Sequence, residues 1–188
     1  MIPLLIPGMP VSERRHSPRL QHPLAAPRYG VMLHYDDSSR DDWAVQWFSD
    51  PRCTYGYTWL VLRDGRVIEL ADPGFRTLHA GPCLRANANS THYGIAAATN
   101  GTTPATPAQV QSIVDCTAAL FAFHHWSADV VNDRIVGHDA QAIWTAGYTS
   151  NPALWGTLGR KVDPTGSRSD RVPIIDIDAV RRAVADRL

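Results

Sequence analysis

Two segments near the end of the chain are the most informative part of the sequence: Arg134-Ile135-Val136-Gly137-His138-Asp139 and Arg160-Lys161-Val162-Asp163-Pro164-Thr165-Gly166. In the first, a short apolar run ends on a glycine and a histidine, which by itself favours a strand end with a solvated or capped histidine. In the second, Lys161 is the only lysine among the 18 lysines and arginines of the chain. A compact ammonium differs from a guanidinium where charge is needed beside a reaction centre, so Lys161 points to chemistry nearby.

Length and composition describe an ordinary globular protein. A chain of 188 residues suits one domain of mixed type. The formal net charge of zero argues against a nucleic-acid partner. No apolar run approaches the roughly 18 residues of a membrane span. Residues 1–7 are apolar but too short for a signal peptide and have no basic leader, so we expect synthesis in the cytoplasm without a signal peptide.

The three cysteines do not form a recognisable framework. Cys53, Cys83 and Cys116 are an odd number without CxxC spacing, which argues against a set of disulfides and against a cysteine zinc site. Cys116 lies in a helical pattern and is interpreted as a small core residue. A bridge between Cys53 and Cys83 is the less favoured alternative. This cysteine usage is typical of a reducing compartment.

Local patterns predict alternating strands and helices. Residues 1–27 are rich in proline and lack a period, which predicts an extended arm. Residues 29–35 read as a strand buried on both faces, and Asp64-Gly65 predicts a hairpin between residues 55–62 and 67–70. Residues 38–50 predict a capped helix with acidic residues in its first turn. A capping box at residues 106–109 begins a long helix that ends at His124 and His125, and residues 174–188 predict a final helix.

Several motifs occur in the order found in the zinc-dependent N-acetylmuramoyl-L-alanine amidase family (type 2), which includes phage lysozyme-amidases and peptidoglycan recognition proteins. They are a strand-end His34, Tyr57 ahead of Asp64-Gly65, Leu78-His79-Ala80-Gly81, Tyr93-Gly94-Ile95, Gly137-His138 and Lys161-Val162-Asp163-Pro164. The sequence therefore resembles this family from His34 to Gly166. The resemblance implies an α/β fold in which residues 28–188 form a single catalytic domain with a central mixed β-sheet flanked by helices.

The resemblance also implies a set of site residues. His34, His138 and Asp163 would bind Zn²⁺, and Tyr57 and Lys161 would be catalytic. His79 would lie beside the substrate cleft without binding metal. Two interpretations stay open from the residues alone: His34 also fits a core histidine with one hydrogen bond, and Tyr57 also fits a cross-strand aromatic.

The residue types suit the implied chemistry. Two neutral histidines and one aspartate leave a zinc site with about one net positive charge, which lowers the pKa of bound water and polarises a carbonyl group. Lys161 would stabilise the negative charge that develops on the carbonyl oxygen. One feature departs from family members that recycle cell-wall fragments, because Ala96 replaces the glutamate that they commonly carry after Gly-Ile. The only glutamates are Glu13 and Glu69, so a glutamate general base is not expected.

The interval between His138 and Asp163 is longer than in many relatives and reads as an inserted loop with a short helix. Trp155 in this loop is a candidate substrate contact, although tryptophans that pack the loop itself explain the pattern equally well. The adjacent His124 and His125 point apart, and we interpret them as compensating the helix terminus rather than as metal ligands.

We expect an enzyme that hydrolyses the amide bond between N-acetylmuramic acid and L-alanine in peptidoglycan or muropeptides. A monomeric phage endolysin, released through a holin to act on the cell wall, is the favoured setting. The alternatives are a cytoplasmic amidase that recycles muropeptides, a peptidoglycan-binding module without catalysis, and a structural virion component.

Overall fold

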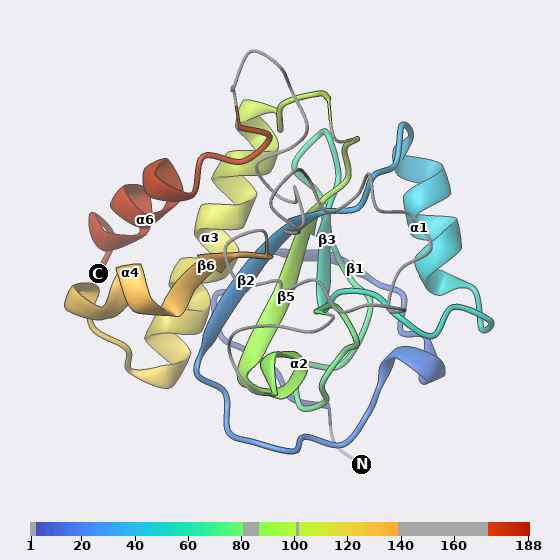
Figure 1. Ribbon diagram of the computed structural model, residues 1–188, viewed down its shortest axis with the longest axis horizontal. Helices are drawn as coiled ribbons and strands as arrows, with labels where there is room; N and C mark the ends of the chain where they lie inside the picture. The colour runs from blue at the N-terminus through green and yellow to red at the C-terminus, as the bar shows by residue number, and fades with distance from the viewer. Residues whose placement is uncertain (1–2, 81–86, 101, 139–172) are drawn as a thin grey trace, which may run out of the picture.

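The computed structural model describes residues 3–80, 87–100, 102–138 and 173–188. Its centre is a six-stranded mixed sheet with the strand order β1-β4-β3-β5-β2-β6 (Figure 1). The strands are β1 Val11–Arg14, β2 Gly30–Tyr35, β3 Trp59–Val61, β4 Val67–Glu69, β5 His92–Ala97 and β6 Ile135–Gly137. The helices are η1 Pro18–Leu20, α1 Asp41–Ser49, α2 Ala88–Thr91, α3 Pro107–His124, η2 Ala128–Val130, α4 Val131–Arg134 and α6 Ile177–Ala185. The predicted α/β class with a mixed sheet and flanking helices is confirmed.

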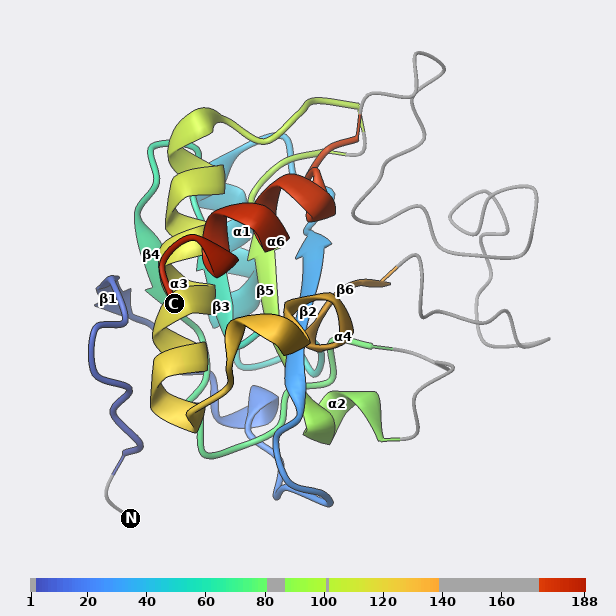
Figure 2. The ribbon, with the colours of Figure 1, turned by 90° about the vertical axis from the view of Figure 1, so that its left-hand side faces the viewer.

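Helices cover both faces of the sheet. In Figures 1 and 2, α3 and α6 lie on one face and α1 lies on the other. Successive side chains of a strand alternate between faces, so β2 sends Leu33 into the core under α3 and α6. Leu60 of β3 joins the second core, which contains Phe48 of α1. Burial on both faces explains why residues 29–35 read as a continuous apolar run.

Strand β2 lies between two parallel neighbours. In register, His34 pairs with Ala96 of β5 and Leu33 pairs with Gly137 of β6. Because all three strands are parallel, their carboxyl ends meet at one edge of the sheet. The strand order therefore brings His34 and the residue that follows β6 close together, although the chain separates them widely.

The predicted hairpin and the predicted long helix are both present. Strands β3 and β4 are antiparallel, and Gly65 in the turn between them has φ of +90°, a conformation that favours glycine. Helix α3 begins with the predicted capping box. The Thr106 hydroxyl accepts a hydrogen bond from the Gln109 backbone at 3.1 Å, and the Gln109 side chain accepts one from the Thr106 backbone at 3.0 Å.

The N-terminal segment contains a strand that its aperiodic sequence did not predict. Strand β1 pairs in parallel with β4 at the edge of the sheet. The Val67 backbone donates to the Ser12 hydroxyl at 3.2 Å, and Arg14 forms an ion pair with Glu69 at 2.9 Å. Contacts with β4 thus hold β1 in place. The division of the chain at residue 27 stays a prediction.

Helix α1 differs from the prediction in its cap. Arg40 occupies the N-cap position and its side chain makes no capping hydrogen bond, although Asp41 and Asp42 lie in the first turn as expected. Of the aromatic residues on this helix, Phe48 is buried, whereas Trp43 and Trp47 are 55% and 49% exposed. The predicted strand at residues 55–62 is regular only over the bounds of β3.

Two further observations concern the cysteines and the lengths of the helices. Cys53 and Cys116 are free and buried, while Cys83 lies outside the described residues. None of the helices in the described part is long and apolar enough to cross a membrane.

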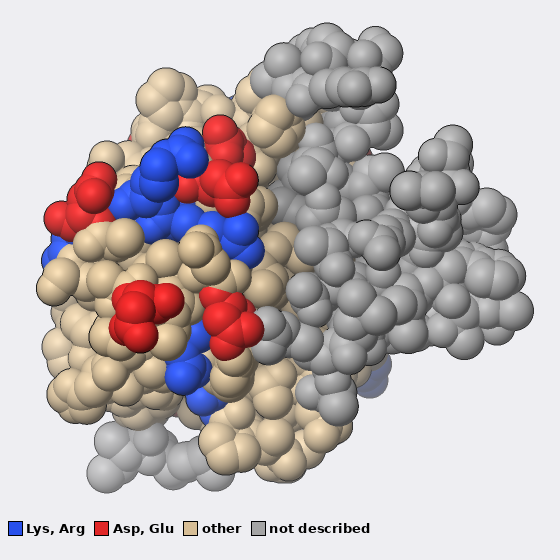
Figure 3. All heavy atoms as spheres, turned by 60° about the vertical axis from the view of Figure 1, so that its left-hand side comes forward, with Lys and Arg blue, Asp and Glu red and all other residues tan. Residues whose placement is uncertain are grey.

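Figure 3 shows acidic and basic side chains interspersed over the face that carries α6. On this helix, Arg181 forms an ion pair with Asp178 at 2.9 Å.

Candidate active site

Two of the three predicted metal ligands lie side by side. His34 of β2 and His138, which directly follows β6, are both fully buried, and their ring centroids are 4.6 Å apart. They lie at the edge where the parallel strands end, on the same face of the sheet as Met32 and Val136. The arrangement follows from the strand order and from the position of each histidine relative to the end of its strand.

His79 packs against this pair. Its ring lies edge-on to His34 with centroids 5.1 Å apart, and its Nδ1 is 3.0 Å from Nε2 of His34. Its other nitrogen, Nε2, donates to the His92 carbonyl at 3.1 Å. Burial, followed by the neighbouring His34 and His138, lowers the pKa of His79 well below its usual value. His79 is therefore a neutral imidazole.

A glycine on β5 makes room for His79. A Cβ atom added to Gly94 would lie 2.7 Å from Cγ of His79, closer than real contacts allow. The glycine of the Tyr93-Gly94-Ile95 motif is thus explained by the close approach of an imidazole ring. We call His34, His79 and His138 the site cluster.

Tyr57 lies at the border of the site cluster. Its ring centroid is 5.0 Å from that of His34 and 5.2 Å from that of Phe48, and its hydroxyl donates to the Tyr35 carbonyl at 3.3 Å. It also lines a groove of about 630 Å³ whose aromatic walls include Trp43, Trp47 and Tyr55. The structure brings Tyr57 to the predicted neighbourhood, where both aromatic packing and a catalytic hydroxyl are compatible with its position.

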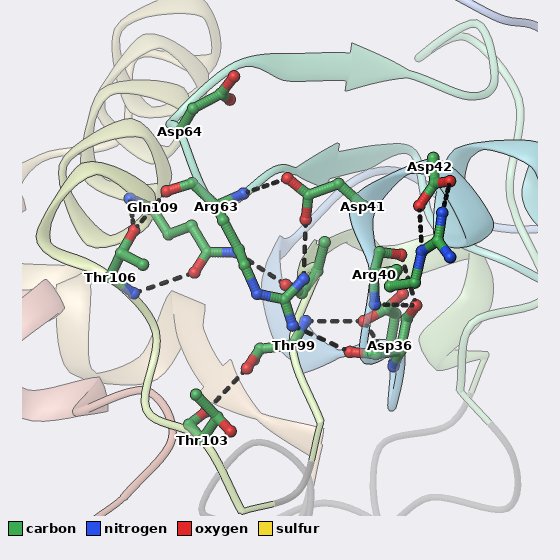
Figure 4. A network of polar contacts seen from close by, with 12 residues as sticks. Asp36, Arg40, Asp41, Asp42, Arg63, Asp64, Thr99, Thr103, Thr106 and Gln109 are labelled. Atoms are coloured by element: carbon green, nitrogen blue, oxygen red, sulfur yellow. Dashed lines mark hydrogen bonds and ion pairs between the residues drawn. The ribbon is translucent and has the colours of Figure 1, made fainter.

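A polar network lies next to the site cluster and was not predicted (Figure 4). One carboxylate oxygen of Asp36 accepts backbone hydrogen bonds from Ser38 at 3.1 Å and Thr99 at 2.9 Å, and burial raises the pKa of this carboxyl to about 7. The Arg63 side chain donates to Asp41 at 2.9 Å and to the Ser38 carbonyl at 3.2 Å.

The same network continues into α3. The Thr106 hydroxyl donates to the Arg63 carbonyl at 2.7 Å, and Gln109 donates to the carbonyls of Val61 and Ala98 at 3.0 and 3.2 Å. These contacts join the carboxyl ends of β2, β3 and β5 to the starts of α1 and α3. The network holds the edge of the sheet that carries His34. The capping box of Thr106 and Gln109 is the one part of the network that the sequence analysis predicted.

His124 belongs to a different group of rings. It stacks on Trp126 with centroids 4.5 Å apart, and its Nε2 lies 3.0 Å from the Tyr93 hydroxyl. Burial, followed by Arg28 and Arg134, lowers the pKa of His124, which disfavours the cation that compensation of the helix terminus requires. We call His124, Tyr93 and Trp126 the packing cluster.

Three predicted site residues, Trp155, Lys161 and Asp163, lie outside the described residues. In the part of the chain that the structure describes, no group of three or more histidine, cysteine, aspartate or glutamate side chains is arranged to hold a metal ion. Both glutamates of the chain have basic partners, since Glu69 bonds Arg14 and Glu13 bonds Arg15. A third metal ligand beside His34 and His138, such as the predicted Asp163, would come from outside the described ranges.

Comparison with known proteins agrees with these observations. The sequence profile of the family described as N-acetylmuramoyl-L-alanine amidase matches residues 25–166. No curated protein matches. Three solved structures have a similar fold: an AmpD derivative (TM-score 0.64, 18% identity, 96% of this chain and 99% of that chain), the hydrolase AmiA of Staphylococcus aureus (0.62, 14%, 93% and 82%) and a mutant endolysin from Bacillus subtilis (0.54, 16%, 69% and 84%). At these identities, the similarity establishes a common fold.

Proposed function

The chain belongs to the N-acetylmuramoyl-L-alanine amidase family, and from this premise we propose that it is a zinc-dependent enzyme that hydrolyses the amide bond between N-acetylmuramic acid and L-alanine. The observation that carries the proposal is the buried pair His34 and His138, with ring centroids 4.6 Å apart, inside the matched region. Two adjacent imidazoles at the carboxyl ends of parallel strands have the composition and the rigid support that a metal site needs.

The residues present fit zinc. His34, His138 and Asp163 would hold the ion, a set of two imidazole nitrogens and one carboxylate that is typical of catalytic zinc with one position left for water or substrate. The imidazoles must be neutral to bind metal. When bound, zinc supplies a Lewis acid that lowers the pKa of water and polarises the scissile carbonyl.

Other residues of the chain would act on the substrate. Lys161, two residues from Asp163, would stabilise the negative charge on the carbonyl oxygen with its ammonium group. The Tyr57 hydroxyl would orient water or donate to the same oxygen after leaving the Tyr35 carbonyl, which it contacts at 3.3 Å. His79 would lie beside the substrate cleft, and Trp155 would contact the substrate.

The bond cut is proposed to be an amide rather than a glycosidic bond. Glycosidic cleavage normally uses two carboxylic groups that flank the acetal. The chain has two glutamates, and Glu69 is occupied by Arg14 and His16 at 2.9 and 2.8 Å. A single Lewis acid suits addition to a planar amide carbonyl instead.

The test is to digest purified peptidoglycan and measure its products. We expect free N-terminal alanine to increase in step with loss of turbidity, without new reducing sugar ends. A chelated sample and a His138→Ala variant serve as controls, and both should release no alanine. Reducing ends without alanine would overturn the proposal, and binding to the wall without either product would favour a non-catalytic module.

For the biological setting we propose a monomeric phage endolysin, made in the cytoplasm and released through a holin to act on the cell wall. The observation in favour is Ala96, which pairs in register with His34 where recycling amidases commonly carry a glutamate. The alternative is a cytoplasmic enzyme that recycles muropeptides. Rates on insoluble sacculi and on soluble muropeptides separate the two, because a recycling enzyme would cleave the soluble substrate and leave sacculi turbid.

A further inference from the structure

We propose that His79 is a positioning residue that fixes the tautomer of His34, so that His34 presents Nδ1 rather than Nε2 to the metal. This inference rests on the proposed zinc function. It concerns a histidine that the family resemblance links to the substrate cleft, and it follows from a chain of two hydrogen bonds that ends on the backbone of β5.

The proton positions follow from the acceptor at the end of the chain. A backbone carbonyl can only accept a hydrogen bond, so Nε2 of His79, 3.1 Å from the His92 carbonyl oxygen, must carry a hydrogen. If Nδ1 of His79 were the donor in its 3.0 Å contact with Nε2 of His34, then Nε2 of His34 would accept and the hydrogen of His34 would lie on its Nδ1, so neither nitrogen of His34 would be left for a metal ion. For the proposed zinc site, Nδ1 of His79 is therefore the acceptor.

The assignment of donor and acceptor nitrogens then extends to His34. Its Nε2 lies 3.0 Å from Nδ1 of His79, so Nε2 of His34 must be the donor and must carry the hydrogen. Nδ1 of His34 is then the unprotonated nitrogen. Since a metal ion binds the unprotonated nitrogen of a neutral imidazole, the tautomer selects the ligand atom.

The relay has a rigid support. The His92 carbonyl belongs to β5, which is paired in register with β2, the strand that carries His34. Gly94 leaves the space that the His79 ring fills, since a Cβ there would lie 2.7 Å from Cγ of His79. One strand thus provides both the acceptor and the space, and His79 cannot rotate without losing one of its two hydrogen bonds.

Histidines that bind metals commonly donate their other N–H to a carbonyl or carboxylate, which orients the ring. Here the partner of His34 is another imidazole, which is itself oriented by a carbonyl. Loss of such a partner costs about 10–100-fold in metal affinity. His79 would therefore contribute to zinc binding without touching zinc.

The first measurement needs neither metal nor activity. Long-range ¹H–¹⁵N spectra of the metal-free wild-type protein should show both His34 and His79 as the Nε2–H tautomer. In His79→Leu, His34 should become a mixture of tautomers. A wild-type His34 with its hydrogen on Nδ1 would overturn the inference, whatever the protein does with zinc.

The second measurement is the dissociation constant for zinc, from competition with a chromophoric chelator at fixed pH. His79→Leu should weaken binding about 10–100-fold. His79→Asn should stay within a few-fold of wild type, because its Oδ1, attached to Cγ, takes the place of Nδ1 and accepts from His34. Gly94→Ala keeps every histidine but displaces the His79 ring, and it should weaken binding in the same direction.

The matched control is His125→Asn, at an exposed position where φ of 54° suits asparagine, and its zinc affinity should equal that of wild type. Equal affinities for wild type and His79→Leu, with circular dichroism of a folded protein, would refute the positioning role. If His79→Leu does not fold, the zinc affinity of Gly94→Ala and the tautomers of the wild-type protein still test the positioning role. A wild-type protein that binds no zinc would instead refute the proposed function, while the spectra decide the tautomer separately.

Discussion

The site cluster and the packing cluster lie on opposite faces of the same strand. On one face of β5, Gly94 makes room for His79 of the site cluster. On the other face, the Tyr93 side chain belongs to the core under α3 and contacts His124 of the packing cluster at 3.0 Å. Neighbouring residues of one strand thus serve two groups of histidines, because a pleated strand sends successive side chains in opposite directions.

The two clusters differ in what surrounds the imidazoles. In the packing cluster, the His124 ring stacks on Trp126, and the guanidinium groups of Arg28 and Arg134 lie 4.1 Å and 4.8 Å from the centroids of Tyr93 and Trp126. Cations so close to the ring would repel a metal ion. In the site cluster, imidazoles face one another at the end of the parallel strands. Arg28 also reaches the site cluster, because it donates at 2.8 Å to the His92 carbonyl that His79 bonds and helps to lower the pKa of His79. Burial and proximity of histidines are therefore not enough to indicate a metal site; the two clusters differ in that guanidinium groups lie directly on the rings of the packing cluster.

The strongest test of this difference removes one histidine from each cluster. His138→Ala should lose stoichiometric zinc and measurable release of alanine, because it removes a ligand. His124→Ala should keep both and should lower the free energy of unfolding by about 1–2 kcal/mol through the lost stacking and hydrogen bond. Elemental analysis, alanine release and urea unfolding measure the three quantities. Stoichiometric zinc in purified His138→Ala, or its absence from His124→Ala, would show that the two clusters do not differ in zinc binding as proposed.

The next effect concerns the cation that each cluster uses. Arg28 and Arg134 lie on the rings of the packing cluster, whereas the site cluster is proposed to act with the Lys161 ammonium. Lys161→Ala should retain zinc and fold but lose about 10²–10³ in turnover, as expected for loss of a group that stabilises an oxyanion. Turnover equal to that of wild type at full zinc occupancy would exclude this role for Lys161.

A smaller effect on turnover distinguishes Tyr57, which borders the site cluster, from Tyr93, which belongs to the packing cluster. Tyr57→Phe keeps the ring that lies 5.0 Å from His34 but removes its hydroxyl, and we expect turnover to fall about tenfold, the worth of one hydrogen bond in the transition state. Tyr93→Phe removes the hydroxyl next to His124 and should change stability only. If Tyr57→Phe loses stability and keeps its turnover, the hydroxyl serves only its bond to the Tyr35 carbonyl.

The smallest predicted effect is on the pH dependence of stability in the metal-free protein. Burial lowers the pKa of both His79 and His124, so the unfolded chain binds protons that the folded chain does not. Stability is then full above the unfolded pKa of about 6.5 and falls as the pH drops through it.

Because His79 is the more deeply buried of the two, His79→Asn should flatten this acid loss more than His124→Asn does. Urea unfolding between about pH 7.5 and pH 5 measures the slopes. A larger change for His124→Asn would reverse the assignment of the more strongly perturbed histidine.

The sequence by itself was sufficient for the elements whose signals are local. The strand around His34, the Asp64-Gly65 hairpin and the capping box of α3 each depend on residues a few positions apart, and each is present. The order of short motifs was also enough to recognise the family. Strand β1 was not predicted, because its stability comes from pairing with β4 rather than from its own pattern.

Only the tertiary structure decided which side chains meet. His34 and His79 are 45 positions apart, and their hydrogen bond depends on β5 lying next to β2 with Gly94 at the point of contact. The same holds for the network that joins Asp36, Arg63 and Gln109. The sequence assigned His79 to the substrate cleft by resemblance, whereas its contacts direct it towards His34. Such contacts cannot be read from local periodicity, because they arise from the order in which distant strands assemble.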